Sequence, residues 1–294
     1  MERDDILIVR IWEGLGNQLF QYAYARALKE KGLDVRLDMD KSYDEVFIKD
    51  PRHDIRQVGL QNFNITLPTM NVEEYGKYQY IRRDSIRDKA IYNMAKCGLW
   101  RYKFYEEFTN CKGSVPAYSA RTANLKGSYY IKGWFQDERY FKQIRKKLLV
   151  ELRPKRRIQI SKELSQALSY DKCVSMHVRR GDYVKVKSVL DIKYYKKAIM
   201  RMKSLYKEPL FLIFSDDLDW VKKNLDIGSD CIYVNENRIL QDYEELIIMS
   251  RCKSNIIANS TYSWWGAWLN RNPEKIIVAP QSQLNPKSKN MILL

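Results

Sequence analysis

The second half of the chain alternates between short apolar segments and amphipathic segments. Such alternation is typical of a parallel β-sheet covered by helices on both faces. The predicted strands lie at residues 173–178, 210–214, 232–234, 255–258 and 275–278, and the predicted helices at 191–206, 218–225, 243–251 and 263–270. This half is therefore predicted to be an α/β domain with its ligand site at the carboxyl ends of the strands.

The first forty residues predict a βαβ unit. An apolar strand at residues 6–11 is followed by a glycine turn and by a helical pattern that opens at Asn17 and stops at Gly32. A second strand is predicted at residues 35–39. The glycine turn thus lies at the carboxyl end of the first strand, where α/β sheets bind ligands.

The middle of the chain is less regular. Between residues 40 and 126 the pattern predicts only scattered helices, and a buried strand at 128–134 and a helix at 138–150 follow. A chain of 294 residues is at the upper limit for one hydrophobic core. We therefore expect two Rossmann-like domains, residues 1–157 and residues 158–294.

The formal charge of +16 favours an acidic partner, which could be nucleic acid, an anionic membrane surface or a phosphorylated substrate. Basic residues concentrate at 142–157, where eight Lys or Arg accompany one acid, Glu151. This stretch is either a solvated helix and linker or a contact to an anionic membrane. No compact basic patch interleaved with aromatic residues is present, which argues against nucleic acid as a partner.

The sequence contains no segment typical of a targeting signal or a membrane span. No apolar run approaches the roughly 18–20 residues of a membrane span, and the chain opens with charged residues. We expect a cytoplasmic protein with at most a peripheral contact at the inner face of the membrane.

A metal site is not expected. Only His53 and His177 are available as imidazole ligands, and the five cysteines are widely spaced. Residues 38–40 (DMD) offer two carboxylates in a DxD pattern that can hold a divalent cation beside a phosphate, but they end the second predicted strand, outside the arginine-containing segment 177–183.

Three segments at predicted strand ends hold polar residues that packing does not require: 14–18, 177–183 and 259–263. In the second of these, HVRRGDY, Arg179 and Arg180 offer planar donors suited to phosphate oxygens. His177 can hydrogen-bond a base, a ribose or an acceptor hydroxyl. Alternatively, the two arginines and Asp182 form a salt-bridged loop anchor.

The other two segments also have structural alternatives. The GLGN turn with Asn17 can simply begin a helix, and Ser260, Thr261 and Ser263 lie where a helix N-terminus presents amides and hydroxyls to an anion. Trp264, Trp265 and Trp268 fit the core better than a sugar-stacking surface.

Four segments, WEGLGNQLFQYAYARAL, HVRRGDY, FSDD and MSRCKSNIIANSTYSWWGAWLN, together resemble glycosyltransferase family 11, the α-1,2-fucosyltransferases. The resemblance implies a GT-B architecture, in which two Rossmann-like domains face each other across a cleft. Residues 1–157 would then form the acceptor side, and residues 158–294 the GDP-sugar-binding domain. It also implies GDP-β-L-fucose as co-substrate, inversion at the anomeric carbon, and neither a cofactor nor an obligatory metal. The implied acceptor is the 2-hydroxyl of a terminal β-galactoside on an oligosaccharide, lipid-linked or not. A GDP-sugar transferase of different linkage and a basic nucleic-acid-binding protein are the alternatives.

The resemblance also implies roles for individual residues. Arg179 looks like the arginine on the β-phosphate, with Arg180 supporting its loop and His177 near the nucleoside. Glu245, where relatives usually have Asp, would contact guanine. The remaining residues implied at the donor are Gly14, Gly16, Asn17, Gln18, Asp216, Asp217, Asn259, Ser260 and Thr261. For Asp217, a helix N-cap is an equal alternative.

Two residues depart from the family pattern. Glu13 stands where a glycine is usual, and Tyr262 where phenylalanine is common. Glu13 could contact the acceptor, act as a base, or be a tolerated surface change. For the general base, Asp182 is the first expectation because it lies three residues from Arg179, and Glu13 is the second.

Overall fold

The computed structural model describes residues 5–40, 58–79, 81, 85–107, 117–125, 127–185, 187–228, 230–237, 239–281 and 291–294. The chain divides into two compact units, Met1–Arg153 and Pro154–Leu294, called here the N-terminal and C-terminal units. The boundary expected from the sequence lies a few residues further along, after Arg157. The roles assigned to the two halves, and the cleft between them, stay predictions.

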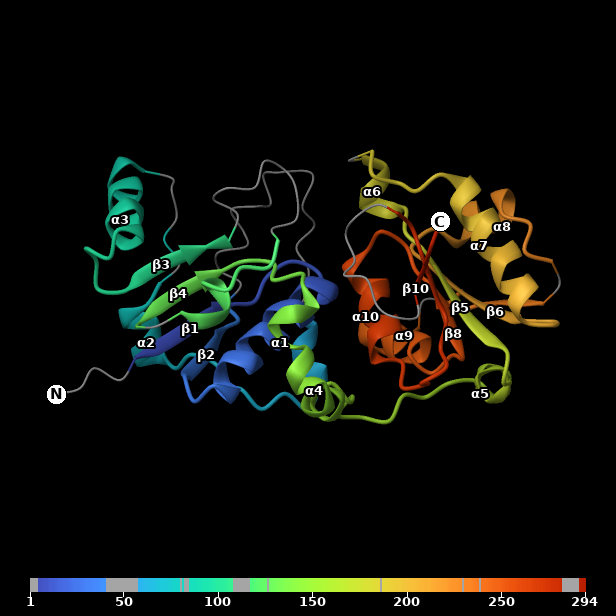
Figure 1. The fold of residues 1–294 in the computed structure, drawn as a ribbon, viewed down its shortest axis with the longest axis horizontal. Coiled ribbons are helices and arrows are strands. Elements are labelled where there is room, and N and C mark those ends of the chain that lie inside the picture. Colours follow the sequence, from blue (N-terminus) through green and yellow to red (C-terminus); the bar gives the residue numbers. More distant parts are fainter. Residues whose placement is uncertain are drawn as a thin grey trace. The chain divides into compact units, whose positions relative to one another are not determined.

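The N-terminal unit is built on a four-stranded parallel sheet in the order β2-β1-β4-β3 (Figure 1). Its strands are β1 (Ile6–Arg10), β2 (Asp34–Asp38), β3 (Lys103–Glu106) and β4 (Tyr129–Lys132). Helix α1 (Leu15–Glu30) connects β1 to β2, which confirms the predicted βαβ unit. The shorter helices are α2 (Val72–Lys77), α3 (Ile86–Lys96) and α4 (Arg145–Glu151).

Two predictions in this unit were wrong. Strand β3 was missed because its alternating residues Phe104 and Glu106 are both buried, so a carboxylate interrupts the apolar pattern. Tyr92 donates to that carboxylate at 2.7 Å, which explains how it is tolerated. The helix expected at 138–150 is broken into two 3₁₀ turns, Glu138–Tyr140 and Lys142–Ile144, before α4 begins.

The C-terminal unit holds a six-stranded parallel sheet in the order β10-β9-β8-β5-β6-β7. Its strands are β5 (Cys173–Val178), β6 (Leu210–Ser215), β7 (Cys231–Tyr233), β8 (Ser254–Ile256), β9 (Ile277–Ala279) and β10 (Met291–Leu293). Its helices are α5 (Lys162–Ser169), α6 (Gly181–Lys185), α7 (Ile192–Leu205), α8 (Leu218–Asn224), α9 (Asp242–Met249) and α10 (Thr261–Leu269). The predicted α/β class is confirmed, with β5, β6 and α7 within a residue or two of their expected bounds; β10 was not predicted.

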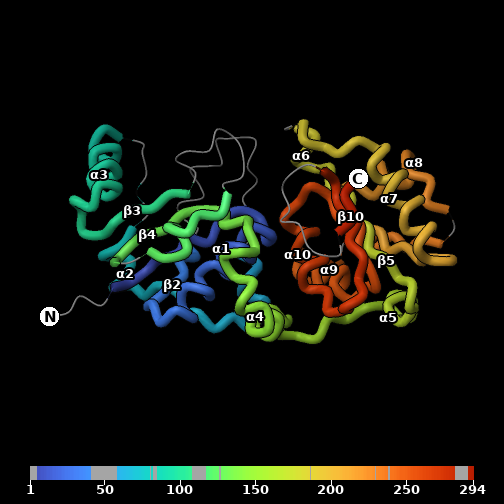
Figure 2. Tube along the Cα trace, in the orientation of Figure 1, coloured from blue at the N-terminus to red at the C-terminus, as the bar shows by residue number. Residues whose placement is uncertain are grey.

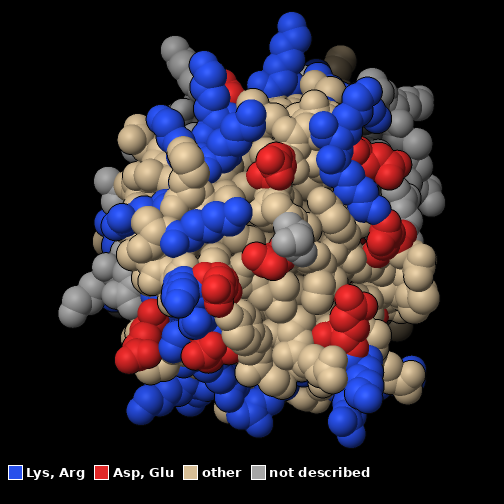
Figure 3. Space-filling view, turned by 90° about the vertical axis from the view of Figure 1, so that its right-hand side faces the viewer, with Lys and Arg blue, Asp and Glu red and all other residues tan. Residues whose placement is uncertain are grey.

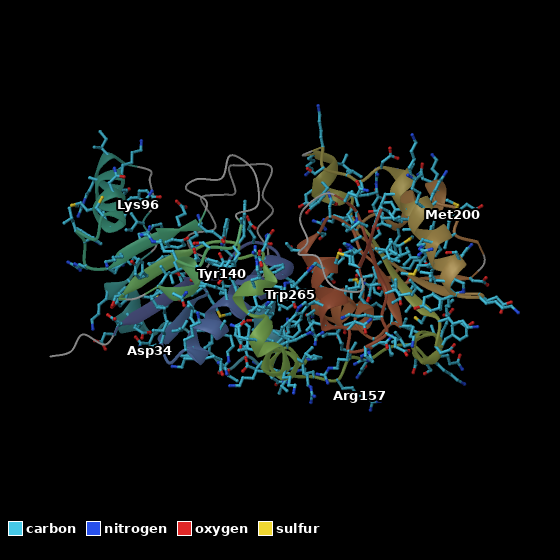
Figure 4. The ribbon with its side chains drawn as sticks, viewed as in Figure 1. Asp34, Lys96, Tyr140, Arg157, Met200 and Trp265 are labelled. Atoms are coloured by element: carbon cyan, nitrogen blue, oxygen red, sulfur yellow. The ribbon has the colours of Figure 1, made fainter. Side chains whose placement is uncertain are left out.

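Helices cover both faces of this sheet, α7 and α8 on one side and α9 and α10 on the other (Figure 1). Alternate residues of β5, such as Met176 and Val178, join the core cluster with Tyr195 and Met202 of α7. Since side chains alternate along a strand, His177 belongs to the opposite face, the one that α10 covers. Trp265 of α10 is fully buried (Figure 4), as expected for a core residue.

The basic connection between the units is solvated. The trace leaves α4 and continues through residues 152–161 to α5 (Figure 2). Arg153, Lys155, Arg156 and Arg157 are all exposed. In the described part of the chain, no helix combines the length and apolar character that crossing a membrane requires.

Candidate functional site

The carboxyl ends of three neighbouring strands bring the predicted residues of the C-terminal unit together. In the sheet order, β5 lies between β8 and β6. Arg179 and Arg180 follow β5, the pair of aspartates 216 and 217 follows β6, and Asn259 comes shortly after β8. Because all three strands are parallel, these segments share one edge of the sheet.

Arg179 is held by two carboxylates. Its Nη1 lies 2.7 Å from Oδ2 of Asp216, and its Nη2 donates to Asp182. The guanidinium also lies over the ring of Tyr183, 5.3 Å from its centroid. A guanidinium has five N–H donors, so these two ion pairs do not exhaust its capacity. The arrangement fits both the phosphate-binding role and the loop-anchor alternative.

Arg180 is fixed differently. Its backbone N–H donates to Asp216 at 2.8 Å, and its Nε donates to Asp217 at 3.1 Å. Its guanidinium lies 3.8 Å from the ring centroid of Trp220, in cation–π contact. Asp217 also accepts from the backbone N–H of Trp220 and so caps α8, which confirms the N-cap alternative; its contact with the donor stays a prediction.

The backbone of Gly181 lies close to the carboxylate of Asp216. A Cβ at this position would lie 2.6 Å from Oδ2 of Asp216, the same oxygen that Arg179 contacts. Real Cβ atoms do not approach an oxygen so closely, so any side chain here would displace the aspartate. Glycine at position 181 therefore leaves room for the carboxylate of Asp216 in its ion pair with Arg179.

His177 is buried and neutral. Burial, together with the positive charge of Arg179, lowers the pKa of its imidazole to about 3. Its Nδ1 has no hydrogen-bond partner among the described residues. The ring lies 5.5 Å from that of Tyr262, centroid to centroid. At neutral pH, this imidazole can donate or accept a hydrogen bond but does not hold a positive charge.

Glu245 lies on α9, and the pKa of its carboxyl group is raised. Burial raises the pKa of its carboxyl group to about 7, although the side chain of Asn235 donates to it, and the nearby charges of Asp242 and Asp216 act in the same direction as burial. Near neutral pH the carboxyl is thus only partly ionised. Asn235 adopts a left-handed backbone conformation, with φ of 61°.

The segment after β8 is tied to the segment after β5. The hydroxyl of Tyr183 donates to the carbonyl of Asn259 at 3.2 Å, and Nδ2 of Asn259 donates to the carbonyl of Ser188 at 2.8 Å. Oδ1 of Asn259 is buried without a partner among the described residues. Ser260 precedes α10 without a side-chain cap bond, and Thr261 begins the helix.

The predicted residues of the N-terminal unit follow β1. Gly14 precedes α1, and Gly16 is buried in its first turn. Gln18 is used internally: its Nε2 donates to the carbonyl of Glu13 at 2.7 Å, and its Oε1 accepts from the backbone of Gly59 at 2.8 Å. Asn17 donates to the carboxylate of Glu13. Whether this loop completes one site with the arginines stays a prediction.

The first aspartate of the DMD segment, Asp38, lies in the interior of the N-terminal unit. Asp38 is buried, accepts from the hydroxyls of Tyr130 and Tyr75, and lies 3.5 Å from Nη1 of Arg10. Over the described residues, no group of three or more His, Cys, Asp or Glu side chains could hold a metal ion. His53 lies outside the described residues.

Sequence reasoning missed several residues at these strand ends. Trp220 and Asn235 contact predicted site residues, but each looks like ordinary helix or turn composition. In the N-terminal unit, Trp134 and Gln136 reach the Glu13 loop through hydrogen bonds. Their only signal was their place at the end of the predicted strand 128–134, whose last residue is Trp134.

Two parallel sheets, with two arginines at the edge of the C-terminal sheet where such sheets bind ligands, are typical of α/β proteins that bind anionic ligands. Residues 102–291 match the model of glycosyl transferase family 11, and the chain belongs to this family. The sequence-based resemblance is thereby confirmed.

Relatives extend the match beyond that range. The O-antigen biosynthesis glycosyltransferase WbnK of Escherichia coli is 33% identical, over 94% of this chain and 95% of its own. The alpha-1,2-colitosyltransferase of Escherichia coli is 31% identical, over 94% of this chain and 91% of its own. Galactoside alpha-(1,2)-fucosyltransferase 1 of Sus scrofa is 30% identical, over 33% of this chain and 28% of its own.

Proposed function

We propose that this family 11 glycosyltransferase moves L-fucose, with inversion, from GDP-β-L-fucose to the 2-hydroxyl of a terminal β-galactoside. The observation that carries the proposal is Arg179, positioned by Asp216 and Asp182 at the carboxyl end of β5. The α-1,2 linkage in the names of two relatives supports the linkage, and the name of the Sus scrofa relative supports fucose and galactoside.

Arg179 stabilises the leaving group in this reaction. The acceptor oxygen bonds to the anomeric carbon while the bond from that carbon to the β-phosphate oxygen breaks, and GDP departs. Negative charge therefore grows on the β-phosphate, where a prepositioned guanidinium is most effective. Ser260 and Thr261 at the start of α10 are proposed to add hydroxyl donors to the phosphates.

The nucleoside is assigned to the α10 side of the sheet. Neutral His177 provides a buried ring nitrogen that has no partner among the described residues, so a nucleoside hydroxyl or amide can satisfy it. Ionised Glu245 can accept the two adjacent N–H groups of guanine. This pairing supports a guanine nucleotide over an adenine nucleotide, which lacks that pair of donors.

Asp182 is proposed to accept the proton of the acceptor hydroxyl. In the structure its carboxylate accepts a hydrogen bond from Arg179. Bound diphosphate competes for the same guanidinium and so releases the carboxylate. If Asp182→Asn retains full turnover while Arg179→Ala does not, Asp182 only braces the loop.

The identity of the transferred sugar is tested by comparing the transfer from two GDP-sugars. Colitose is fucose without its 3-hydroxyl, and it is the sugar named for one relative. Purified enzyme would receive GDP-fucose or GDP-colitose with lactose, with EDTA in a parallel arm, and the product would be identified by mass spectrometry and NMR. We expect fucose on the galactose 2-hydroxyl; preferred transfer of colitose, or another linkage, would overturn the proposal.

The acceptor is proposed to be an O-antigen glycan, as the name of WbnK suggests, and to be lipid-linked during synthesis. The exposed basic residues 153–157 then supply a peripheral contact to anionic lipid. Binding to vesicles containing phosphatidylglycerol should fall when these charges are neutralised. Unchanged binding would dismiss the contact.

A nucleic-acid partner receives less support. On the face shown in Figure 3, Lys and Arg side chains lie around the edge with acidic side chains among them, so the described residues form no continuous basic band there. With a phosphorylated co-substrate, the positive charge of the chain has an adequate partner.

A further inference from the structure

Glu13 has a backbone conformation that disfavours its side chain. Its φ is 63°, in the left-handed region that glycine adopts without penalty. A non-glycine residue persists there only when the surroundings hold it, and such residues cluster at functional sites. The side chain of Glu13 is therefore expected to contribute something that a glycine could not.

The carboxylate of Glu13 joins two adjacent strand ends. Its Oε2 accepts from the indole N–H of Trp134 at 3.0 Å and from the amide of Asn17. Oδ1 of Asn17 in turn accepts from Nε2 of Gln136 at 2.8 Å. Glu13 and Asn17 follow β1, whereas Trp134 and Gln136 follow β4, its neighbour in the sheet.

A second indole is aligned with the first. The rings of Trp12 and Trp134 are 11° from parallel with centroids 6.4 Å apart, and both residues are partly exposed. The indole N–H of Trp12 donates to the carbonyl of Gly133 at 3.3 Å. The ammonium of Lys132 lies 4.6 Å from the Trp12 ring centroid. Both aromatic rings are thus fixed by polar contacts.

Two buried acceptors beside these rings lack donors. Oε1 of Gln136 and Oε1 of Glu107 have no hydrogen-bond partner among the described residues. The other oxygen of Glu107 accepts from the backbone N–H groups of Trp134 and Phe135, at 2.8 Å each. Buried acceptors without donors are rare in native proteins and indicate a missing partner, such as a ligand hydroxyl.

We propose that Trp134, Trp12 and Gln136 form a pyranose-binding surface at the carboxyl edge of the N-terminal sheet, with Glu13 as its positioning residue. The ligand is the terminal β-galactose of the acceptor, so the inference rests on the proposed function. Galactose has one apolar face of C–H groups that packs against aromatic rings, and its hydroxyls can donate to the unpartnered oxygens of Gln136 and Glu107. Glu13 acts through Trp134 and Asn17.

Glu13→Gly and Glu13→Gln separate this role from the alternatives. Glycine suits the backbone but removes the acceptor for Trp134, whereas the amide oxygen of glutamine can replace it. With GDP-fucose and lactose, we expect Glu13→Gly to raise the KM for lactose at least tenfold with little change in the KM for GDP-fucose. Glu13→Gln should stay within about threefold of wild type in both. Melting temperatures would show that Glu13→Gly remains folded.

Other outcomes overturn the inference. An unchanged KM for lactose in Glu13→Gly removes the positioning role, and a loss of kcat in Glu13→Gln as large as in Glu13→Gly makes Glu13 a base instead. Saturation-transfer NMR with methyl β-galactoside, without nucleotide, tests the surface separately. We expect a signal with wild type and none with Trp134→Leu; no signal with wild type refutes the surface. Failure to bind GDP or to hydrolyse GDP-fucose refutes the proposed function instead.

Discussion

Arg179 and Asp216 form a 2.7 Å ion pair between the ends of two adjacent parallel strands. The last paired residues of β5 and β6, Val178 and Ser215, immediately precede the two partners. Both side chains are only partly exposed, at 16% and 26%, so solvent screens the pair incompletely. The pair directs a charged donor to the sheet edge before any substrate arrives.

Replacing Arg179 tests the leaving-group role. In Arg179→Ala the charge that grows on the β-phosphate loses its donor, so we expect kcat to fall by about two to three orders of magnitude. Steady-state release of GDP measures the effect. Arg201→Ala, at an exposed position of α7, is the control and should match wild type. Turnover of Arg179→Ala above a tenth of wild type would contradict the leaving-group role of Arg179.

Gly181→Ala tests the close approach to Asp216. The added Cβ would meet Oδ2 of Asp216 at 2.6 Å, so the aspartate must leave its position beside Arg179. We expect the Kd for GDP to rise at least tenfold, measured by calorimetry. Gly76→Ala is the matched control because nothing lies within 4 Å of a Cβ there and helix α2 favours alanine. Equal affinities in the two variants would contradict the role of Gly181.

The affinity for GDP should depend on the protonation of Glu245. The pKa of this carboxyl is raised to about 7 by burial, so below that pH the free enzyme holds a proton that guanine must displace. The Kd for GDP should therefore rise by up to about tenfold for each pH unit below 7 and level off above it. Calorimetry from pH 5.5 to 8 measures this. In Glu245→Gln, the pH dependence of the Kd that remains is due to the phosphates of GDP. An identical pH profile in both proteins would exclude Glu245 as the cause of the pH dependence.

The stability of the N-terminal unit should fall as pH rises, because of Glu107. Burial raises the pKa of its carboxyl to about 7, so the folded state holds the proton more tightly than the unfolded state. The stabilisation is complete below the unfolded pKa and is lost as pH rises through 7. We expect Glu107→Gln to be more stable than wild type by roughly 3 kcal/mol at pH 8, with a much smaller difference at pH 4.5. Urea unfolding at both pH values tests this, and a pH-independent difference would refute it.

The elements that the sequence predicted well are those whose pattern is local. Strand β5 combines an uninterrupted buried run with flanking turn residues, and the predicted and observed bounds agree. Strand β3 escaped because buried Glu106 depends on Tyr92, a partner supplied by α3. Strand β10 is only three residues long, and its identity as a strand depends on pairing with β9.

The residues of the candidate site also divide into those that the local sequence predicted and those that it did not. The arginines, the glycine and the aspartates were recognisable because their chemistry and their position after a predicted strand are written in consecutive residues. The cation–π partner Trp220, the neutral state of His177 and the contact of Trp134 with Glu13 were not.

The sequence by itself determined which side chains stand at the strand ends, because strand and helix periodicity and turn residues are properties of neighbouring positions. Only the tertiary structure decided which of them meet. Arg179 reaches Asp216 because β6 lies beside β5, and Glu13 reaches Trp134 because β4 lies beside β1. The left-handed backbone of Glu13 was likewise established only by the tertiary structure, since a φ value that disfavours a side chain is imposed by the surroundings and not by the residue that adopts it; its one sequence signal was the glycine usual at this position of the family.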